Sequence, residues 1–143
     1  MKTIFDVLKD SHEKQRLLMD ALLQTSGDSL ARKEFYESLK KELTDHAVAE
    51  ERHFYAPLIE SDKSIDMTRH GIAEHHVIDK VIAEIDATEM SSPAWLTLMK
   101  KLQHKVEHHL QEEELKFFQT AGKVLDEKAK KELAIEYEKE MAA

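Results

Sequence analysis

Histidine and glutamate are the residues of this sequence whose types and spacing could do chemistry. The 143-residue chain has nine histidines and no cysteine, and His-x-x-x-Glu occurs at two related places, each with a lone histidine 34 positions before it. Without thiolates, imidazole nitrogens and carboxylate oxygens suit iron, manganese or zinc. The pattern therefore indicates a metal site with nitrogen and oxygen donors. The candidate ligands are His12, His46, Glu50, His75, His109 and Glu113.

The candidate ligands belong to an internal repeat. An offset of 63 residues carries His12 onto His75, and the same offset carries Glu50 onto Glu113 without a gap. The apolar neighbours of these residues follow the same offset. Coincidental similarity between amphipathic helices would explain the apolar matches, but not the matched histidines and glutamates. The repeat therefore predicts two similar helix pairs that contribute equivalent ligands to one site.

The elements that must position these ligands are predicted to be helices. Three glycines and two prolines are too few for the many turns of a β-sandwich or barrel. Short connections between long amphipathic segments are typical of an up-down-up-down four-helix bundle. We expect an all-α fold with residues 1–122 as the bundle and residues 123–143 as a C-terminal helix, packed on the bundle or at a dimer interface. The expected helices are Thr3–Ser26, Asp28–Glu60, Ser64–Thr88, Ser92–Gly122 and Asp126–Met141.

The candidate ligands fall inside the apolar stripes of these helices. At about 100° per residue, His46 and Glu50 lie on the same line as Leu39 and Leu43, and the fourth helix repeats the arrangement. A carboxylate in an apolar interior is costly unless it is paired or coordinated. Core histidines satisfied by hydrogen bonds to glutamate are the alternative without a metal. Two repeated pairs with two further histidines favour two divalent metal ions over that alternative.

The remaining histidines are weaker candidates. His108 and Glu112 form a further His-x-x-x-Glu, but its direction from the core line is wrong for this site. His70 has no partner in the repeat and is expected near a helix start. His53 lies one turn beyond Glu50 and stays an outside candidate. The histidines expected in solvent are His76, His104 and His108.

One pair of positions beside the ligands leaves alternatives open. Arg16 and Asp79 are equivalent in the repeat, each four residues after a candidate ligand. They could form a salt bridge between helices, or they could orient His12 and His75. Tyr55, which follows the first His-x-x-x-Glu motif, is expected to pack in the core near the end of the bundle.

Composition and charge exclude several classes of function. With 21 basic and 29 acidic residues, the formal net charge of -8 opposes nucleic acids and anionic membranes. The lack of cysteine excludes disulfides, iron–sulfur clusters and cysteine nucleophiles. The few glycines exclude a glycine-rich phosphate loop. The start of the chain has no uninterrupted apolar stretch, and no run reaches the length of a membrane span, so we expect a cytoplasmic protein.

The motifs resemble the hemerythrin-like family, also called the HHE cation-binding domain, over about residues 4 to 122. The resemblance rests on His-x-x-x-Glu-Glu followed by two aromatic residues, which occurs twice, and on a lone histidine beside Glu13 and after Glu74. It implies a four-helix bundle with a non-heme di-iron centre, completed by an oxo, hydroxo or water ligand. Manganese and zinc are less expected. In this reading His12 and His46 serve one iron, His75 and His109 serve the other, and Glu50 and Glu113 bridge them.

Some positions depart from the oxygen-carrying members of that family. Those proteins have an extra histidine where this chain has Gly71, and an aspartate five residues after the last histidine ligand. Here Glu113 lies four residues after His109. The departures indicate a more symmetric site, and they argue against reversible oxygen carriage. Ferritin-like enzymes carry Glu-x-x-His, with the glutamate first, so that family is rejected.

Three classes of function follow from this reading. The leading expectation is a di-iron protein that interacts with dioxygen, peroxide or nitric oxide, or that holds iron for sensing or delivery. The second is a di-iron enzyme, such as an oxidase, a peroxidase or an iron-centre repair protein, although no acid–base pair beyond the ligands is evident. The third is a structural bundle stapled by zinc. The chain is expected to be a monomer or a homodimer.

Overall fold

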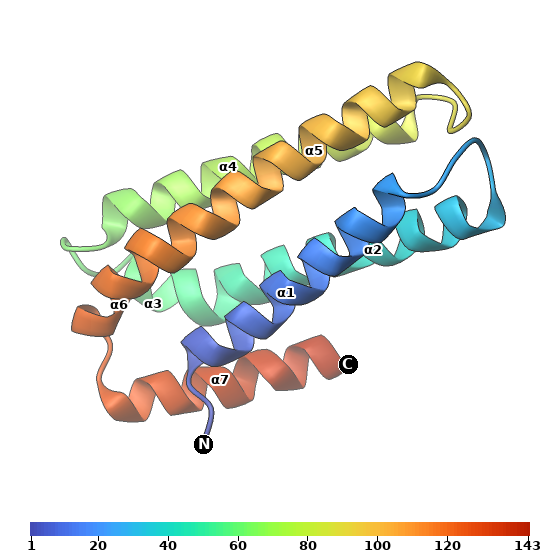
Figure 1. The fold of residues 1–143 in the computed structure, drawn as a ribbon. Coiled ribbons are helices and arrows are strands. Elements are labelled where there is room, and N and C mark those ends of the chain that lie inside the picture. The colour runs from blue at the N-terminus through green and yellow to red at the C-terminus, as the bar shows by residue number, and fades with distance from the viewer.

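The computed structural model describes all 143 residues and contains helices and turns without strands. Four long helical segments run up and down beside one another (Figure 1), so the expected bundle fold is confirmed. None of the helices is both long and apolar enough to cross a membrane. The elements are α1 Ile4–Leu23, α2 Leu30–Glu50, the π-helical turn η1 Glu51–Tyr55, α3 Ala56–Leu58, α4 Ile65–Asp86, α5 Pro93–Glu112, the π-helical turn η2 Glu113–Phe117, α6 Phe118–Val124 and α7 Glu127–Ala142.

Side-chain caps define where the helices begin. Thr3 and Asp6 form a capping box at the start of α1, and Ser92 caps α5, whose first residue is proline. These residues satisfy amide groups that have no partner inside the helix. Helix α1 ends three residues earlier than expected, and Gly27, with a φ of 60°, turns the chain toward α2. A positive φ is accessible to glycine without steric cost.

The apolar core is divided into two clusters by the predicted ligands. Along every long helix the order is apolar residues, predicted ligand, apolar residues, so the ligands form a polar layer across the bundle. One cluster contains Trp95 and Met99 with the residues around them, and the other contains Phe54, Tyr55 and Phe118. The polar layer is thus enclosed by apolar side chains on both sides.

Helix α7 lies against the first half of the repeat. It folds back beside the start of α1 (Figure 1) and contacts α1, α2 and η1. Ala134 and Tyr137 are its buried residues. Within this chain, α7 thus packs on the bundle. One face of α1 and α2 is therefore covered by a helix that the repeat itself does not supply.

Candidate metal centre

The six predicted ligands meet in the polar layer. The two glutamates are fully buried, and none of the four histidines is more than 4% exposed. Donor atoms within 4.8 Å of one another form two groups that share Glu50. The first group is His12, His46, Glu50 and Glu113, and the second is Glu50, His75 and His109. The structure thus brings all six residues together, while their role as metal ligands stays a prediction.

Each glutamate faces both halves of the layer. Glu50 directs Oε2 toward His46 at 3.5 Å and Oε1 toward His75 at 3.0 Å. Glu113 directs Oε1 toward Nε2 of His12 at 3.2 Å and Oε2 toward Nε2 of His109 at 3.3 Å. Each carboxylate therefore presents one oxygen to a histidine of each half, which is the orientation that a bridging carboxylate requires.

The buried atoms that face each other in this layer lack hydrogen-bond partners. Nε2 of all four histidines, both carboxylate oxygens of Glu50 and Oε1 of Glu113 are buried without one. Most buried polar atoms in proteins have a partner, because leaving one unpaired is costly. Lone pairs of imidazole and carboxylate that converge in this way are satisfied by cations. The donor set, nitrogen and oxygen without sulfur, fits iron, manganese or zinc.

The opposite ring nitrogen of each histidine is held by a second protein group. His12 Nδ1 lies 2.7 Å from Glu114, His75 Nδ1 lies 2.8 Å from Glu51, and His109 Nδ1 lies 2.7 Å from Glu74. His46 Nδ1 instead lies 2.6 Å from the Tyr137 hydroxyl of α7. A carboxylate that accepts from Nδ1–H fixes the tautomer and leaves the Nε2 lone pair free for a metal. Carboxylates therefore hold three of the four imidazoles in an orientation that would suit metal binding.

The same carboxylates govern the protonation of the metal-free layer. Burial by itself lowers the pKa of His12, but the neighbouring carboxylates of Glu113 and Glu114 raise that pKa to about 9. The pKa of His75 is also raised to about 9, against the effect of burial, by Glu50 and Glu51. Protons on the imidazoles thus balance the buried carboxylates without metal. Metal binding must displace these protons, so metal binding and proton release are coupled.

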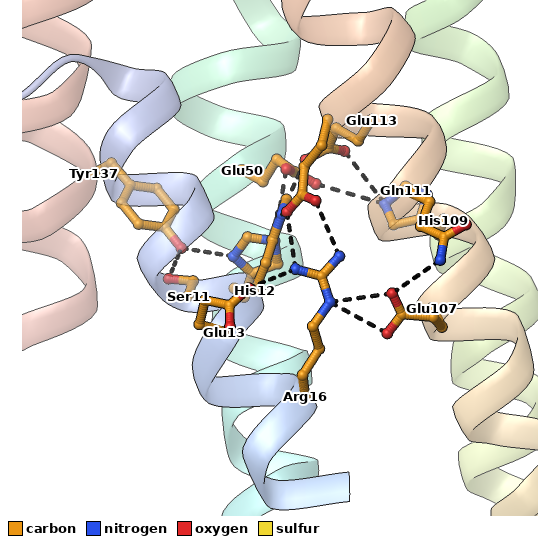
Figure 2. A network of polar contacts seen from close by, with 12 residues as sticks. Ser11, His12, Glu13, Arg16, Glu50, Glu107, His109, Gln111, Glu113 and Tyr137 are labelled. Carbon is orange, nitrogen blue, oxygen red and sulfur yellow. Dashed lines mark hydrogen bonds and ion pairs between the residues drawn. The ribbon is translucent and has the colours of Figure 1, made fainter. Parts of the chain in front are cut away.

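Arg16 does not pair with Asp79, but it forms salt bridges between helices with two other carboxylates, those of Glu107 and Glu114. Its guanidinium turns toward α5 and donates to Glu107 at 3.1 Å (Figure 2). It also donates to both oxygens of Glu114. Burial raises the pKa of Glu114, but His12 and Arg16 outweigh it and lower that pKa to about 2. Arg16 thus keeps Glu114 charged and directed at His12. Asp79 is exposed at the equivalent position.

Tyr55 is closer to the chemistry than the sequence suggested. Its hydroxyl donates to Glu113 Oε2 at 2.6 Å, and its ring stacks on His75 with 5.5 Å between centroids. A Cβ on Gly71 would collide with the Tyr55 hydroxyl. Glycine at 71 therefore makes room for the tyrosine where oxygen-carrying relatives are expected to have a histidine. Glycine at position 71 together with tyrosine at position 55 is the sequence signal that could have predicted this contact.

Two π-helical turns direct adjacent glutamates to different places. In η2, Glu113 belongs to the central layer while Glu114 reaches the outer nitrogen of His12. In η1, Glu51 reaches His75 directly after Glu50 has faced the layer. Single π-helical turns widen a helix and are frequent at functional sites. The regular helical angle of about 100° per residue does not predict these π-helical turns.

The other histidines lie outside the layer. His53, the outside candidate, pairs with Glu140 of α7 at 2.8 Å. His76 and His104 are exposed, as the sequence indicated. His108 and Glu112 are 3.3 Å apart on the outer side of α5, where they face His70. The sequence predicted that His108 and Glu112 point away from the core, and they lie there in the structure.

Comparisons with known proteins agree with the fold and the layer. The model of the hemerythrin HHE cation-binding domain matches residues 3–121. The chain belongs to this family, a class of metal-binding helical bundles. A crystal structure of a hemerythrin HHE cation-binding domain-containing protein from Mycobacterium kansasii superposes with a TM-score of 0.90 at 21% identity, over 99% of this chain and 86% of that one. That likeness concerns the fold.

A longer curated protein also resembles this chain. A DNA nickase from Nostoc sp. (strain PCC 7120) is 28% identical over 134 residues. The match covers 94% of this chain but 38% of the Nostoc protein. The chain thus spans well under half the length of that relative.

Proposed function

We propose that this protein holds two iron ions in the central layer and uses them to bind dioxygen, peroxide or nitric oxide, or to hold iron for sensing or delivery. The observation that carries the proposal is the set of buried donor atoms without partners, Nε2 of four histidines and three glutamate oxygens. Iron would supply open coordination positions and a change of oxidation state. The protein would supply the ligands and exclude bulk water.

The orientation of the glutamates supports a division of the ligands between two metal positions. His12 and His46 would hold one iron, and His75 and His109 would hold the other. Glu50 and Glu113 would bridge, because each presents its two oxygens to different halves. Tyr55 would restrain Glu113 through its hydrogen bond.

The space beside the layer supports a small ligand. A cavity of about 20 Å³ touches the layer and is lined by Gln15, His46, His75 and His109 among aliphatic side chains. That volume is on the order of one water molecule. It suits a diatomic molecule or peroxide better than an organic substrate, so the observation favours ligand binding over an enzyme acting on larger molecules.

The nickase activity of the Nostoc protein is not extended to this chain. The match leaves most of that protein uncovered, and the net charge of -8 opposes association with a phosphate backbone. For this chain we propose metal binding alone, on the evidence of its own buried donor atoms.

Anaerobic spectroscopy tests the proposal. The iron-loaded, reduced protein should develop new visible absorption when nitric oxide is added, and zinc-loaded protein should stay colourless. Iron-loaded protein whose spectrum is unchanged by dioxygen, peroxide and nitric oxide would contradict a ligand-binding function.

A further inference from the structure

Gln15 carries a buried amide that the ligand set does not use. The residue lies on α1, three positions after His12, and is 1% exposed. Its Nε2 is buried without a hydrogen-bond partner. Unlike the unpartnered atoms of the layer, a neutral amide group is a poor ligand for iron and cannot be satisfied by coordination. A buried amide donor without an acceptor normally indicates a missing partner.

The cavity beside the layer is where that partner would lie. Gln15 lines this cavity together with three of the predicted ligands, His46, His75 and His109. Leu43, Ile78 and Val106 form much of the remaining wall. A molecule in this space would therefore touch the metal ligands on one side and the amide of Gln15 on another.

The internal repeat shows that the polar residue is not required for packing. The offset of 63 residues places Gln15 on Ile78, which lines the same cavity from α4. Equivalent positions thus present an aliphatic side chain from one half and an amide from the other. An aliphatic residue at 15 would fill similar space without leaving a donor unpaired.

We propose that the Gln15 amide is the hydrogen-bond donor for a small ligand held in this cavity. The ligand class is a molecule of two or three heavy atoms with an exposed acceptor atom, such as dioxygen, nitric oxide, peroxide or azide. Gln15 acts as a binding and specificity residue, because ligands without an acceptor gain nothing from it. The proposal rests on the proposed function and names the residue that discriminates between ligands at that site.

Azide binding to the iron-loaded protein tests this role. The variant Gln15→Leu should bind azide about tenfold more weakly than the unmodified protein, since one hydrogen bond to a charged ligand is lost. The infrared stretching frequency of bound azide should also shift. Gln103→Leu is the matched control, because Gln103 donates to Asp20 on the surface, and it should leave affinity and frequency unchanged.

Thermal unfolding separates this role from a structural one. Replacing an unpartnered buried amide by leucine should leave the melting temperature equal or higher. Weaker azide binding with an undiminished melting temperature and unchanged iron content supports the proposal. Equal azide affinity and frequency in Gln15→Leu, or iron-loaded protein that binds no azide, would overturn it. Absence of iron from the unmodified protein would instead overturn the proposed function, and elemental analysis distinguishes the two failures.

Discussion

The two halves of the internal repeat supply the same ligands but support them differently. In the second half, Glu74 of α4 directly holds Nδ1 of His109. The equivalent residue in the first half is Ser11, which is too short to reach His46. Ser11 instead lies 2.7 Å from the Tyr137 hydroxyl (Figure 2). That hydroxyl also contacts Nδ1 of His46.

This difference would make the two proposed metal positions unequal. A carboxylate bonded to Nδ1 increases the basicity of the imidazole and strengthens its bond to a metal, whereas a neutral phenol does so less. We expect the position at His12 and His46 to bind metal more weakly than the position at His75 and His109. The weaker position also depends on α7, which lies beyond the segment matched by the family model.

Removing the shared glutamates should abolish metal binding at both proposed positions, and with it the difference between the two halves. The double variant Glu50→Ala, Glu113→Ala loses both carboxylates that face the two halves, and we expect no metal to be retained. Elemental analysis after gel filtration measures this. The double variant His76→Ala, His104→Ala, which alters exposed histidines, should keep the normal content. Full iron content in the glutamate variant would disprove the ligand assignment.

Changing Glu74 should make the second half resemble the first. Glu74→Ser removes the acceptor of His109 Nδ1 and offers no tyrosine in its place. We expect the metal affinity of one position to fall about 10- to 100-fold, measured by competition with a chelator. Glu84→Ser, at an exposed position of the same helix, is the control. Unchanged affinity would show that the carboxylate does not tune the ligand.

Removing the Tyr137 hydroxyl should weaken the first half alone. In Tyr137→Phe the ring stays in place, and His46 Nδ1 and Ser11 lose their partner. We expect about a tenfold loss of affinity at one position, a smaller loss than for Glu74→Ser, because a neutral group is removed. Tyr36→Phe is the matched control, since its buried hydroxyl bonds Asp86 away from the layer. If Tyr137→Phe weakened both positions equally, the proposed asymmetry would be wrong.

Arg16 should give the smallest effect. Arg16→Gln removes the charge that helps to hold Glu114, but the hydrogen bond between Glu114 and His12 remains. Because the guanidinium is partly exposed and solvent screens it, we expect a loss of affinity on the order of threefold at one position. Arg69→Gln, at an exposed position of α4, should have no effect. A loss as large as that of Glu74→Ser would place Arg16 among the residues that determine affinity.

The bundle and the convergence of the six candidate ligands could be predicted because they follow simple rules along the chain. His12 and Glu50 recur at a fixed offset, and the apolar stripes have helical periodicity. Tyr137 follows no such rule: its helix lies outside the repeat, and only the folded chain brings it to His46.

Local departures from regular geometry explain the other missed contacts. The turns η1 and η2 redirect Glu51 and Glu114, which a constant helical angle places elsewhere. Arg16 and Asp79 are equivalent in the repeat, but the partners of Arg16 lie on α5 and η2. The repeat identifies equivalent positions, and it does not identify which neighbours each of them contacts.

The most direct test is the metal content of protein purified without oxygen, together with its near-ultraviolet spectrum. We expect about two irons per chain, by analogy with di-iron sites in helical bundles, and absorption that changes on reduction and on exposure to oxygen. Colourless protein that contains only zinc, or that contains no metal after incubation with ferrous iron, would contradict it.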